Sequence, residues 1–319
     1  MNDYRKLLLL VFLWLPFIAI AQVNTAATSF RIVPLGVLGG ADESNLSAYM
    51  LAPKGSDNYI CLDAGTIRAG IAKAIAYKTF TIPAEQVLKK DIKGYFISHA
   101  HLDHVAGLIM NSPEDSTKNI YGLQSTLKTV KTHYFTWDSW ANFADDGVAP
   151  QLKKYHYQSL TPGTKMPVEN TGMQVQVFQL SHANLSSTAF LVSSKDNYIL
   201  YLGDTGADEV EKSQNLHNLW VAVAPLIKAK KLKAIMIEVS FPNEQPEKNL
   251  FGHLTPHLLM NEMTELGKLS GRSLKGLNVV ITHLKPPYKS ILKIKAQLKT
   301  ANKLQLNLIY PKQGIALQL

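Results

Sequence analysis

Three of the ten histidines in this 319-residue chain fall within six positions, in the run HAHLDH at 99–104. Imidazole nitrogens and carboxylate oxygens are the ligands that borderline divalent cations such as Zn²⁺ take when thiolates are absent. His99 and His101 would point to one side of an extended segment, because side chains there alternate with period two. A tight turn can return Asp103 and His104 toward the same cavity. The alternative is a polar loop that happens to be rich in histidine, but four potential ligands in six residues favour a metal site.

Three more residues of the same chemical types stand just after apolar runs. His182 follows a run that ends in QLS, Asp204 follows YILYLG and His283 follows NVVIT. The carboxyl ends of strands are where α/β proteins gather their site residues. Alone, each would more often be a capping or turn residue. Together with the first cluster they make five histidines and two aspartates, which is what two adjacent metal ions need, with three ligands each and one bridging carboxylate.

Strands must position these residues, and the chain has many short apolar runs bounded by Gly, Asp and Pro, which are typical of buried strands. They are predicted at 30–37, 46–52, 59–62, 94–98, 173–180, 189–193, 198–202, 234–239 and 277–282, with helices at 67–80 and 256–269. The polar stretch 111–170 lacks clear periodicity and is predicted as helices and loops that cover the site. Strands followed by helices, twice over, predict an α/β fold of two packed sheets with helices outside, in a single domain.

Composition excludes several classes of protein. A hydrophobic fraction of 46% with 18% charged residues rules out disorder and collagen-like or repetitive architectures. Cys61 is the one cysteine, so an internal disulfide, a cysteine-rich zinc module and an iron–sulfur cluster are ruled out. The formal charge of +9 favours encounter with anions. We nevertheless expect no nucleic-acid partner, because arginines interleaved with aromatic residues are missing.

The first residues predict export. Residues 1–21 have a short basic start, an apolar stretch at 7–20 and small residues that end at Ala21, the pattern of a signal peptide. Cleavage near Ala21/Gln22 would give a mature chain of 22–319, periplasmic or secreted and free of the membrane. An uncleaved membrane anchor is the alternative.

The ordered set of ligand types resembles the metallo-β-lactamase superfamily of αββα sandwich hydrolases. The longer run HAHLDHVAGLIMNS at 99–112 is similar to the signature of the class II cyclic nucleotide phosphodiesterases. So are the segments LGVLGGADESNLSAY at 35–49, LDAGT at 62–66, EVSFPN at 238–243 and GHLT at 252–255. The resemblance implies a single metallo-β-lactamase-type domain and hydrolysis of 3′,5′-cyclic AMP, with cyclic GMP as a further candidate, to the 5′-nucleotide. Some members of that branch are exported bacterial enzymes.

The resemblance also implies a role for each residue. One metal ion would be held by His99, His101 and His182, the second by Asp103, His104 and His283, with Asp204 bridging them. Asp63 would brace the site. Zinc β-lactamases that use a cysteine ligand are disfavoured, since Cys61 lies inside a predicted strand. Two divalent cations are expected, with Zn²⁺ favoured and Mn²⁺ or Fe²⁺ as alternatives.

In the implied mechanism, a hydroxide held between the metals attacks phosphorus. Asp103 would orient it and accept its proton. His253 would contact the phosphate and protonate the departing ribose 3′-oxygen, with Glu238 holding the imidazole ring. The alternatives are that His253 caps the helix near Pro256 or simply packs, and that Glu238 accepts backbone hydrogen bonds.

Two other functions compete with this one. The first is another hydrolase of the same fold, acting on a lactone, a thioester or an RNA phosphodiester. The second is a non-catalytic protein that binds nucleotides through metals. The run 99–112 argues against the first, and the complete ligand set argues against the second. A small-molecule cyclic nucleotide is the expected partner, and a homodimer is the base-rate expectation for assembly.

Weaker signals have ordinary explanations. Four histidines without a partner pattern are predicted at the surface or in packing: His133, His156, His217 and His257. Trp137, Trp140 and Phe143 could stack on a nucleobase, but an aromatic cluster in a helical cover is more often core. A solvated helix face is predicted for Lys289, Lys293, Lys295 and Lys299.

Overall fold

Two seven-stranded sheets lie against each other in residues 29–319, the part of the chain that the computed structural model describes. In spatial order the strands of the first sheet are β14 (Leu317–Gln318), β1 (Phe30–Gly36), β2 (Ala48–Pro53), β3 (Tyr59–Leu62), β4 (Ile92–Phe96), β5 (Lys118–Leu123) and β6 (Tyr155–Leu160). Those of the second sheet are β13 (Asn307–Ile309), β12 (Asn278–Thr282), β11 (Leu232–Glu238), β10 (Asn197–Leu202), β9 (Leu185–Ser194), β8 (Met173–His182) and β7 (Lys165–Val168).

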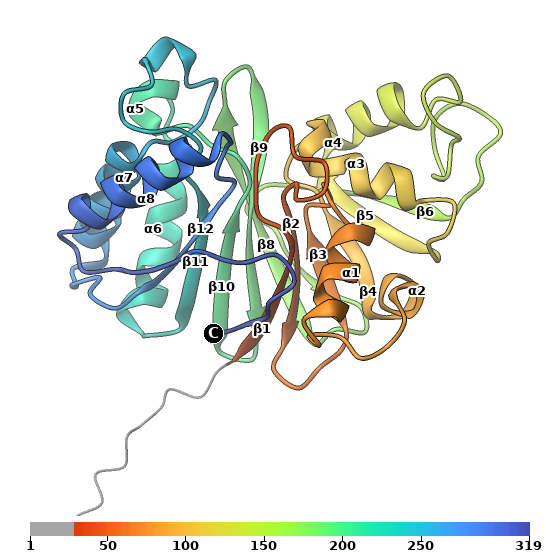
Figure 1. Cartoon of the computed structure of the whole chain (residues 1–319), viewed down its shortest axis with the longest axis horizontal. Helices are drawn as coiled ribbons and strands as arrows, with labels where there is room; N and C mark the ends of the chain where they lie inside the picture. Colours follow the sequence, from red (N-terminus) through yellow and green to blue (C-terminus); the bar gives the residue numbers. More distant parts are fainter. Residues whose placement is uncertain (1–28) are drawn as a thin grey trace, which may run out of the picture.

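Helices cover the outer face of each sheet (Figure 1). Those over the first sheet are α1 (Arg68–Ala76), α2 (Ala84–Gln86) with the π-helical turn Val87–Asp91, α3 (Leu102–Asn111), and α4 (Gln124–Thr129) with the π-helical turn Val130–Tyr134. Those on the side of the second sheet are α5 (Asp208–Glu211), α6 (Asn215–Lys228), the 3₁₀ turn Glu247–Asn249, α7 (Pro256–Ser270) and α8 (Tyr288–Ala301). The expected αββα sandwich is confirmed.

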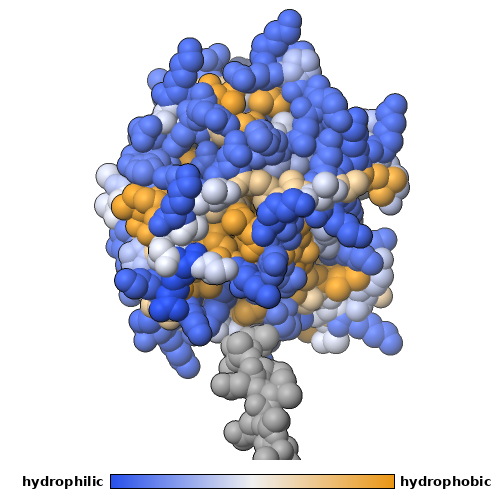
Figure 2. All heavy atoms as spheres, turned by 90° about the vertical axis from the view of Figure 1, so that its left-hand side faces the viewer, coloured by the Kyte–Doolittle hydropathy of each residue, from blue (hydrophilic) through white to orange (hydrophobic). Residues whose placement is uncertain are grey.

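Three apolar layers hold these elements together. The middle layer lies between the sheets, where the ring of Phe96 stacks on Tyr121 at 4.4 Å and meets Phe190 edge-on at 5.5 Å. The outer layers lie between each sheet and its helices, and Trp220 of α6 is the largest fully buried side chain among them. The outward surface of the α6–α8 side is mostly hydrophilic with hydrophobic patches between the charged residues (Figure 2).

Strand direction brings the expected site residues to one edge. Strands β10, β11 and β12 run parallel to one another, as do β3 and β4. Parallel strands end at the same edge of a sheet, so the loops that follow them meet there. This edge lies at the top of Figure 1, where α3 begins.

The prediction of helices and loops for 111–170 was wrong in part, because the stretch contains β5, β6 and β7. In β6 only one side is paired with a neighbouring strand, and Gln158 and Ser159 are exposed. Polar residues are typical of such edge strands, and they hide the alternation that reveals a strand. The predicted helix at 67–80 is also shorter and ends at Ala76, with Lys78 in the left-handed region at φ 58°.

The predicted signal peptide, 1–21, and its cleavage site lie outside the described residues. Between residues 29 and 319, no helix combines the length and the apolar character needed to cross a bilayer. Cys61 lies inside β3 and is buried, as predicted.

Candidate metal centre

The histidine-rich run joins the end of β4 to the start of α3. His99 follows the strand by three residues, and His101 is the residue that precedes the first helical turn, with extended backbone angles of φ −67° and ψ 150°. Asp103 and His104 belong to that first turn. The expected tight turn is therefore the beginning of a helix, which returns the two side chains toward the same cavity.

Five overlapping groups of three side chains could each hold a metal ion at this edge, and two of these groups have the residues that the resemblance implied. In the first, His101 Nδ1 lies 3.0 Å from His99 Nε2 and 3.3 Å from His182 Nε2. In the second, Asp103 Oδ2 lies 3.1 Å from His283 Nε2, and Asp103 Oδ1 lies 4.0 Å from His104 Nε2. These are the two triads that the resemblance implied.

Asp204 lies between the two triads. Its Oδ2 is 3.2 Å from His104 Nε2 and 3.2 Å from His283 Nε2. The same oxygen is 3.8 Å from His99 Nε2 and 3.9 Å from His182 Nε2. One carboxylate oxygen is thus near ring nitrogens of both groups, which is the position of a bridging ligand.

Four of the five histidines present Nε2 to the cluster because their other ring nitrogen is engaged. The Nδ1–H groups donate to acceptors outside the cluster: His99 to Ser98 Oγ at 3.1 Å, His104 to Asp63 Oδ2 at 2.8 Å, His182 to the carbonyl of Gly252 at 2.8 Å, and His283 to Ser240 Oγ at 2.9 Å. Such hydrogen bonds fix the tautomer and orientation of a metal-binding imidazole. His104 Nε2 is buried and makes no hydrogen bond of its own, so its lone pair fits a cation.

Asp63 stabilises this arrangement through hydrogen bonds to residues next to the cluster. It has φ 54°, and its carboxylate accepts hydrogen bonds from Ser98 N at 2.7 Å, Ser98 Oγ at 2.8 Å and Tyr201 Oη at 2.6 Å, besides that from His104. A residue held off the common backbone regions, with four hydrogen bonds to its side chain, is typical of a functional site.

The electrostatics differ among the histidines of the cluster. Burial opposes protonation of His104, but the carboxylates of Asp204 and Asp63 outweigh it and raise the pKa of that imidazole. Burial lowers the pKa of His99 and His101, and lowers that of His182 to about 4. Burial opposes ionisation of Asp103 and Asp204, but the neighbouring histidines outweigh it and hold both carboxyl pKa values below their usual range. Neutral imidazoles and ionised carboxylates are the forms that bind divalent cations.

Several residues of the site carried no sequence signal of their own. A Cβ added at Gly39 would lie 2.1 Å from the His283 ring, so only glycine fits against that ligand. The neighbouring Gly40 N–H donates to Asp103 Oδ2 at 2.9 Å. His283 itself has φ 54°. The double glycine within 35–49 could have indicated this close approach of the backbone. Ser240 lies within the segment EVSFPN at 238–243, but its contact with His283 was not predicted, and Tyr201 belongs to no recognisable motif.

His253 stands beside the cluster without being one of the seven residues. Its Nδ1 donates to Glu238 Oε1 at 2.7 Å, and its Nε2 faces Lys285 Nζ at 2.8 Å. Thr255, not His253, caps α7 by accepting from Leu258 N, so the capping alternative was wrong. Glu238 also accepts hydrogen bonds from the backbone N–H groups of Thr205 at 3.2 Å and Leu254 at 3.4 Å. It therefore binds both the His253 ring and the backbone, as the two alternatives for this residue proposed.

The residues with weaker signals lie outside the cluster. His156 pairs with Asp145 at 3.0 Å, and Lys293 of α8 pairs with Glu244 at 2.9 Å. Trp137 and Trp140 are 43% and 37% exposed, so the expectation that they belong to the core was wrong. Their stretch is loop-rich, and each indole instead donates a hydrogen bond to a neighbouring segment.

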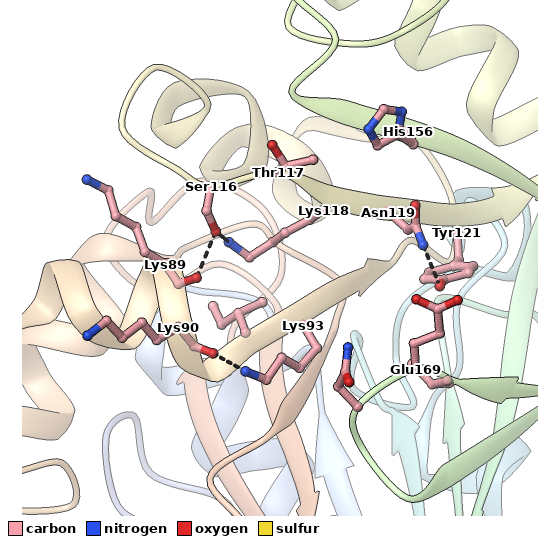
Figure 3. Close-up of a pocket in the computed structure, with 13 residues that line it drawn as sticks. Lys89, Lys90, Lys93, Ser116, Thr117, Lys118, Asn119, Tyr121, His156 and Glu169 are labelled. Atoms are coloured by element: carbon pink, nitrogen blue, oxygen red, sulfur yellow. Dashed lines mark hydrogen bonds between the residues drawn. The ribbon is translucent and has the colours of Figure 1, made fainter.

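A separate hollow of about 570 Å³ lies at the other ends of β4 and β5 and shares no residue with the cluster (Figure 3). Most of its basic side chains already have partners. Lys89 pairs with Glu85, Lys118 pairs with Asp115, and Lys93 donates to a backbone carbonyl. Two of its four lysines, Lys89 and Lys118, are therefore paired with carboxylates.

Solved structures show which fold this protein has. The chain is similar to the metallo-β-lactamase fold protein YhfI from Bacillus subtilis, with a TM-score of 0.59 and 14% identity over 91% of this chain and 99% of that one. It is also similar to unliganded yeast PDE1, with a TM-score of 0.81 and 24% identity over 92% of this chain and all of that one. The protein has the metallo-β-lactamase fold, and its histidine–aspartate cluster has the side chains and spacing to hold divalent metal ions.

Sequence comparison gives the family. The model of the class-II cAMP phosphodiesterases matches residues 28–314. The chain is 44% identical over 317 residues to the 3′,5′-cyclic-nucleotide phosphodiesterase of Aliivibrio fischeri, covering 94% of this chain and 96% of that protein. The chain therefore belongs to the class-II cAMP phosphodiesterases, and the resemblance seen in the sequence is confirmed.

Proposed function

We propose that the protein hydrolyses 3′,5′-cyclic AMP, and cyclic GMP as a second substrate, to the 5′-nucleotide at a site for two divalent cations. Family membership supports the substrate class. The observation that supports the dinuclear site is Asp204, whose Oδ2 lies within 4 Å of ring nitrogens from both triads. Fold alone would not select this activity, because one fold serves many reactions.

The donor set favours Zn²⁺ at both positions. One ion would be held by three imidazoles, the other by two imidazoles and a carboxylate, with Asp204 shared. Imidazole and carboxylate suit zinc, and among residues 29–319 no cysteine belongs to the groups that could hold a metal. Such a pair of cations supplies an activated water and neutralises the charge of the phosphodiester.

Asp103 orients the attacking water and takes up its proton. Its Oδ2 is fixed by the Gly40 N–H at 2.9 Å and by His283 at 3.1 Å, so the carboxylate is held in one orientation before substrate arrives. Groups that are already oriented need no reorganisation during reaction.

His253 acts at the other end of the reaction, on the ribose 3′-oxygen that leaves phosphorus. Glu238 Oε1, 2.7 Å from Nδ1, keeps that nitrogen protonated and directs Nε2 away from the cluster. Ser240 Oγ donates to Glu238 Oε2 at 2.6 Å and so fixes the carboxylate in turn. A histidine oriented in this way contacts the phosphate, and once Nε2 has taken up a proton from solvent it delivers that proton to the leaving oxygen.

The experiment that tests this function measures hydrolysis of cyclic AMP by the purified chain, with the product identified chromatographically. Formation of 5′-AMP that stops with a chelator supports the function. Binding without turnover would favour the non-catalytic alternative, and turnover of a lactone, thioester or RNA instead would favour another hydrolase. The Asp103→Ala variant should be inactive, while the exposed, matched Asp196→Ala variant should keep the wild-type rate.

A second variant separates His253 from the metal ligands. His253→Ala should lower turnover by about a hundredfold, the usual contribution of a positioned acid, with the metal content unchanged. Loss of metal from this variant would make His253 a ligand instead.

We further propose that the protein is exported after cleavage near Ala21/Gln22, on the strength of the basic, apolar and small-residue pattern of 1–21. Cell fractionation with N-terminal sequencing of the recovered chain tests this. The homodimer stays a prediction, which light scattering of the purified protein tests.

A further inference from the structure

Lys285 lies beside His253, and the proposed reaction gives it no role. It follows the metal-site residue His283 by two positions, in the loop between β12 and α8. Its backbone is held in place because Leu284 bridges to Leu38 and accepts a hydrogen bond from Gly39 N at 3.3 Å. The side chain is half-buried and reaches back to the site rather than out to solvent.

Two contacts fix the ammonium group. Nζ lies 2.8 Å from His253 Nε2 and 5.2 Å from the centre of the Phe241 ring. The ring of Phe241 in turn meets His253 nearly edge-on at 5.7 Å. Within residues 29–319 no carboxylate oxygen lies within 4.0 Å of this ammonium, whereas Lys118 and Lys293 each have one.

These contacts place the ammonium charge on the side of the His253 ring that faces away from Glu238 and Asp204. Nδ1 of that ring faces Glu238 and lies 3.8 Å from Asp204 Oδ2, while Nε2 faces the lysine. The ring therefore separates the ammonium from the cluster. An ammonium that donates to a neutral imidazole would gain Coulomb attraction by exchanging it for an anionic oxygen, because opposite charges attract strongly at the low effective dielectric of a partly buried site.

We propose that Lys285 binds a non-bridging oxygen of the phosphate group in the substrate and in the 5′-nucleotide product. Arrival of that oxygen draws the ammonium away from His253 Nε2, which is then free to face the leaving ribose oxygen. The cyclic phosphodiester would then reach the metal cluster with one oxygen and Lys285 with another. This inference rests on the proposed function and adds to it a substrate-binding residue.

The test compares Lys285→Met, which keeps length and removes charge, with Lys285→Arg, which keeps charge. Lys289→Met is the matched control, since Lys289 is exposed and lies four residues further on. In the metal-loaded protein, calorimetry measures binding of 5′-AMP and of adenosine. We expect Lys285→Met to weaken 5′-AMP binding and to raise KM for cyclic AMP about tenfold, the effect of losing one charged hydrogen bond. Lys285→Arg should recover most of the affinity, adenosine binding should not change, and the control should match the wild type.

A second comparison distinguishes direct contact from an effect through His253. In a His253→Ala background, Lys285→Met should still weaken 5′-AMP binding about tenfold. Equal affinities in that background would show that Lys285 acts only by positioning His253, and would overturn the inference. So would an unchanged affinity in the single variant, or loss of metal from it. Wild-type turnover of cyclic AMP reports on the proposed function independently of all these variants.

Discussion

Asp63→Asn is the substitution that most directly tests how the metal site is held. Asparagine keeps the size of the side chain but replaces one accepting oxygen with an amide that only donates. In the wild type, Oδ2 accepts from Ser98 Oγ, His104 Nδ1 and Tyr201 Oη, and Oδ1 accepts from Ser98 N. We expect the asparagine oxygen to take the Oδ2 position, where three donors meet. The asparagine NH₂ group then faces the Ser98 N–H, so that two donors meet without an acceptor.

The cost follows from these four contacts. Three hydrogen bonds to a charged acceptor become bonds to a neutral one, at about 1 kcal/mol each, and the stranded buried N–H costs about 1–3 kcal/mol. Such contributions are not additive, so we expect a loss of about 4 kcal/mol in the free energy of unfolding. The melting temperature should fall by about 10 °C. Because the bond from Asp63 orients His104, zinc affinity should fall about 10–100-fold.

The assay is thermal unfolding of the metal-free chain, followed by competition for Zn²⁺ with a chromogenic chelator. Asp196→Asn is the control, because its carboxylate is 82% exposed and its pair with Lys231 is a surface salt bridge of little energetic weight. A melting temperature and zinc affinity equal to those of the control would refute the reasoning, since the buried hydrogen bonds would then contribute neither to folding nor to the site.

Other predictions concern different parts of the molecule. Asp115→Asn should lower the free energy of unfolding by about 3–5 kcal/mol in urea, because it leaves the buried Lys118 ammonium without its carboxylate. Turnover per folded molecule should not change. A decrease in the free energy of unfolding well below about 3 kcal/mol would contradict the importance of this pair. Burial raises the pKa of Glu262, so the fold favours its protonated form, and this stability is present below about pH 4 and is lost as pH rises through the folded pKa. Glu262→Gln cannot ionise, so its stability relative to wild type should rise from pH 4 to pH 7, whereas exposed Glu247→Gln should show no such trend and a flat difference would refute the assignment. Glu238→Gln should lower turnover modestly, by about tenfold, with metal content unchanged, because a neutral acceptor holds His253 less firmly; a wild-type rate would make Glu238 purely structural.

The seven residues of the cluster could be predicted from the sequence because each one lies at the carboxyl end of a strand or in the segment that follows it. His182 ends β8, Asp204 follows β10 and His283 follows β12. Strand direction then brings them to one edge, so position along the chain was enough to predict proximity in space. The same reasoning gave the two-sheet architecture, since buried strands appear as short apolar runs.

The residues that orient these ligands could not be predicted in the same way. Ser240 contacts His283 across 43 positions, and Tyr201 contacts Asp63 across 138. A single serine, tyrosine or lysine has no spacing that distinguishes it, and its role comes only from the packing of separate loops. The strands β5 to β7 were missed for a related reason, because polar residues at a sheet edge conceal the alternation on which strand prediction depends.

Zinc titration of the stripped protein, with hydrolysis of cyclic AMP recorded at each addition, tests the central claim most directly. The claim is that two triads and the shared Asp204 hold a pair of cations that act together on a cyclic nucleotide. Turnover should be absent without metal and should rise until two equivalents per chain are bound. Full turnover in the stripped protein, or a plateau after one equivalent, would contradict it.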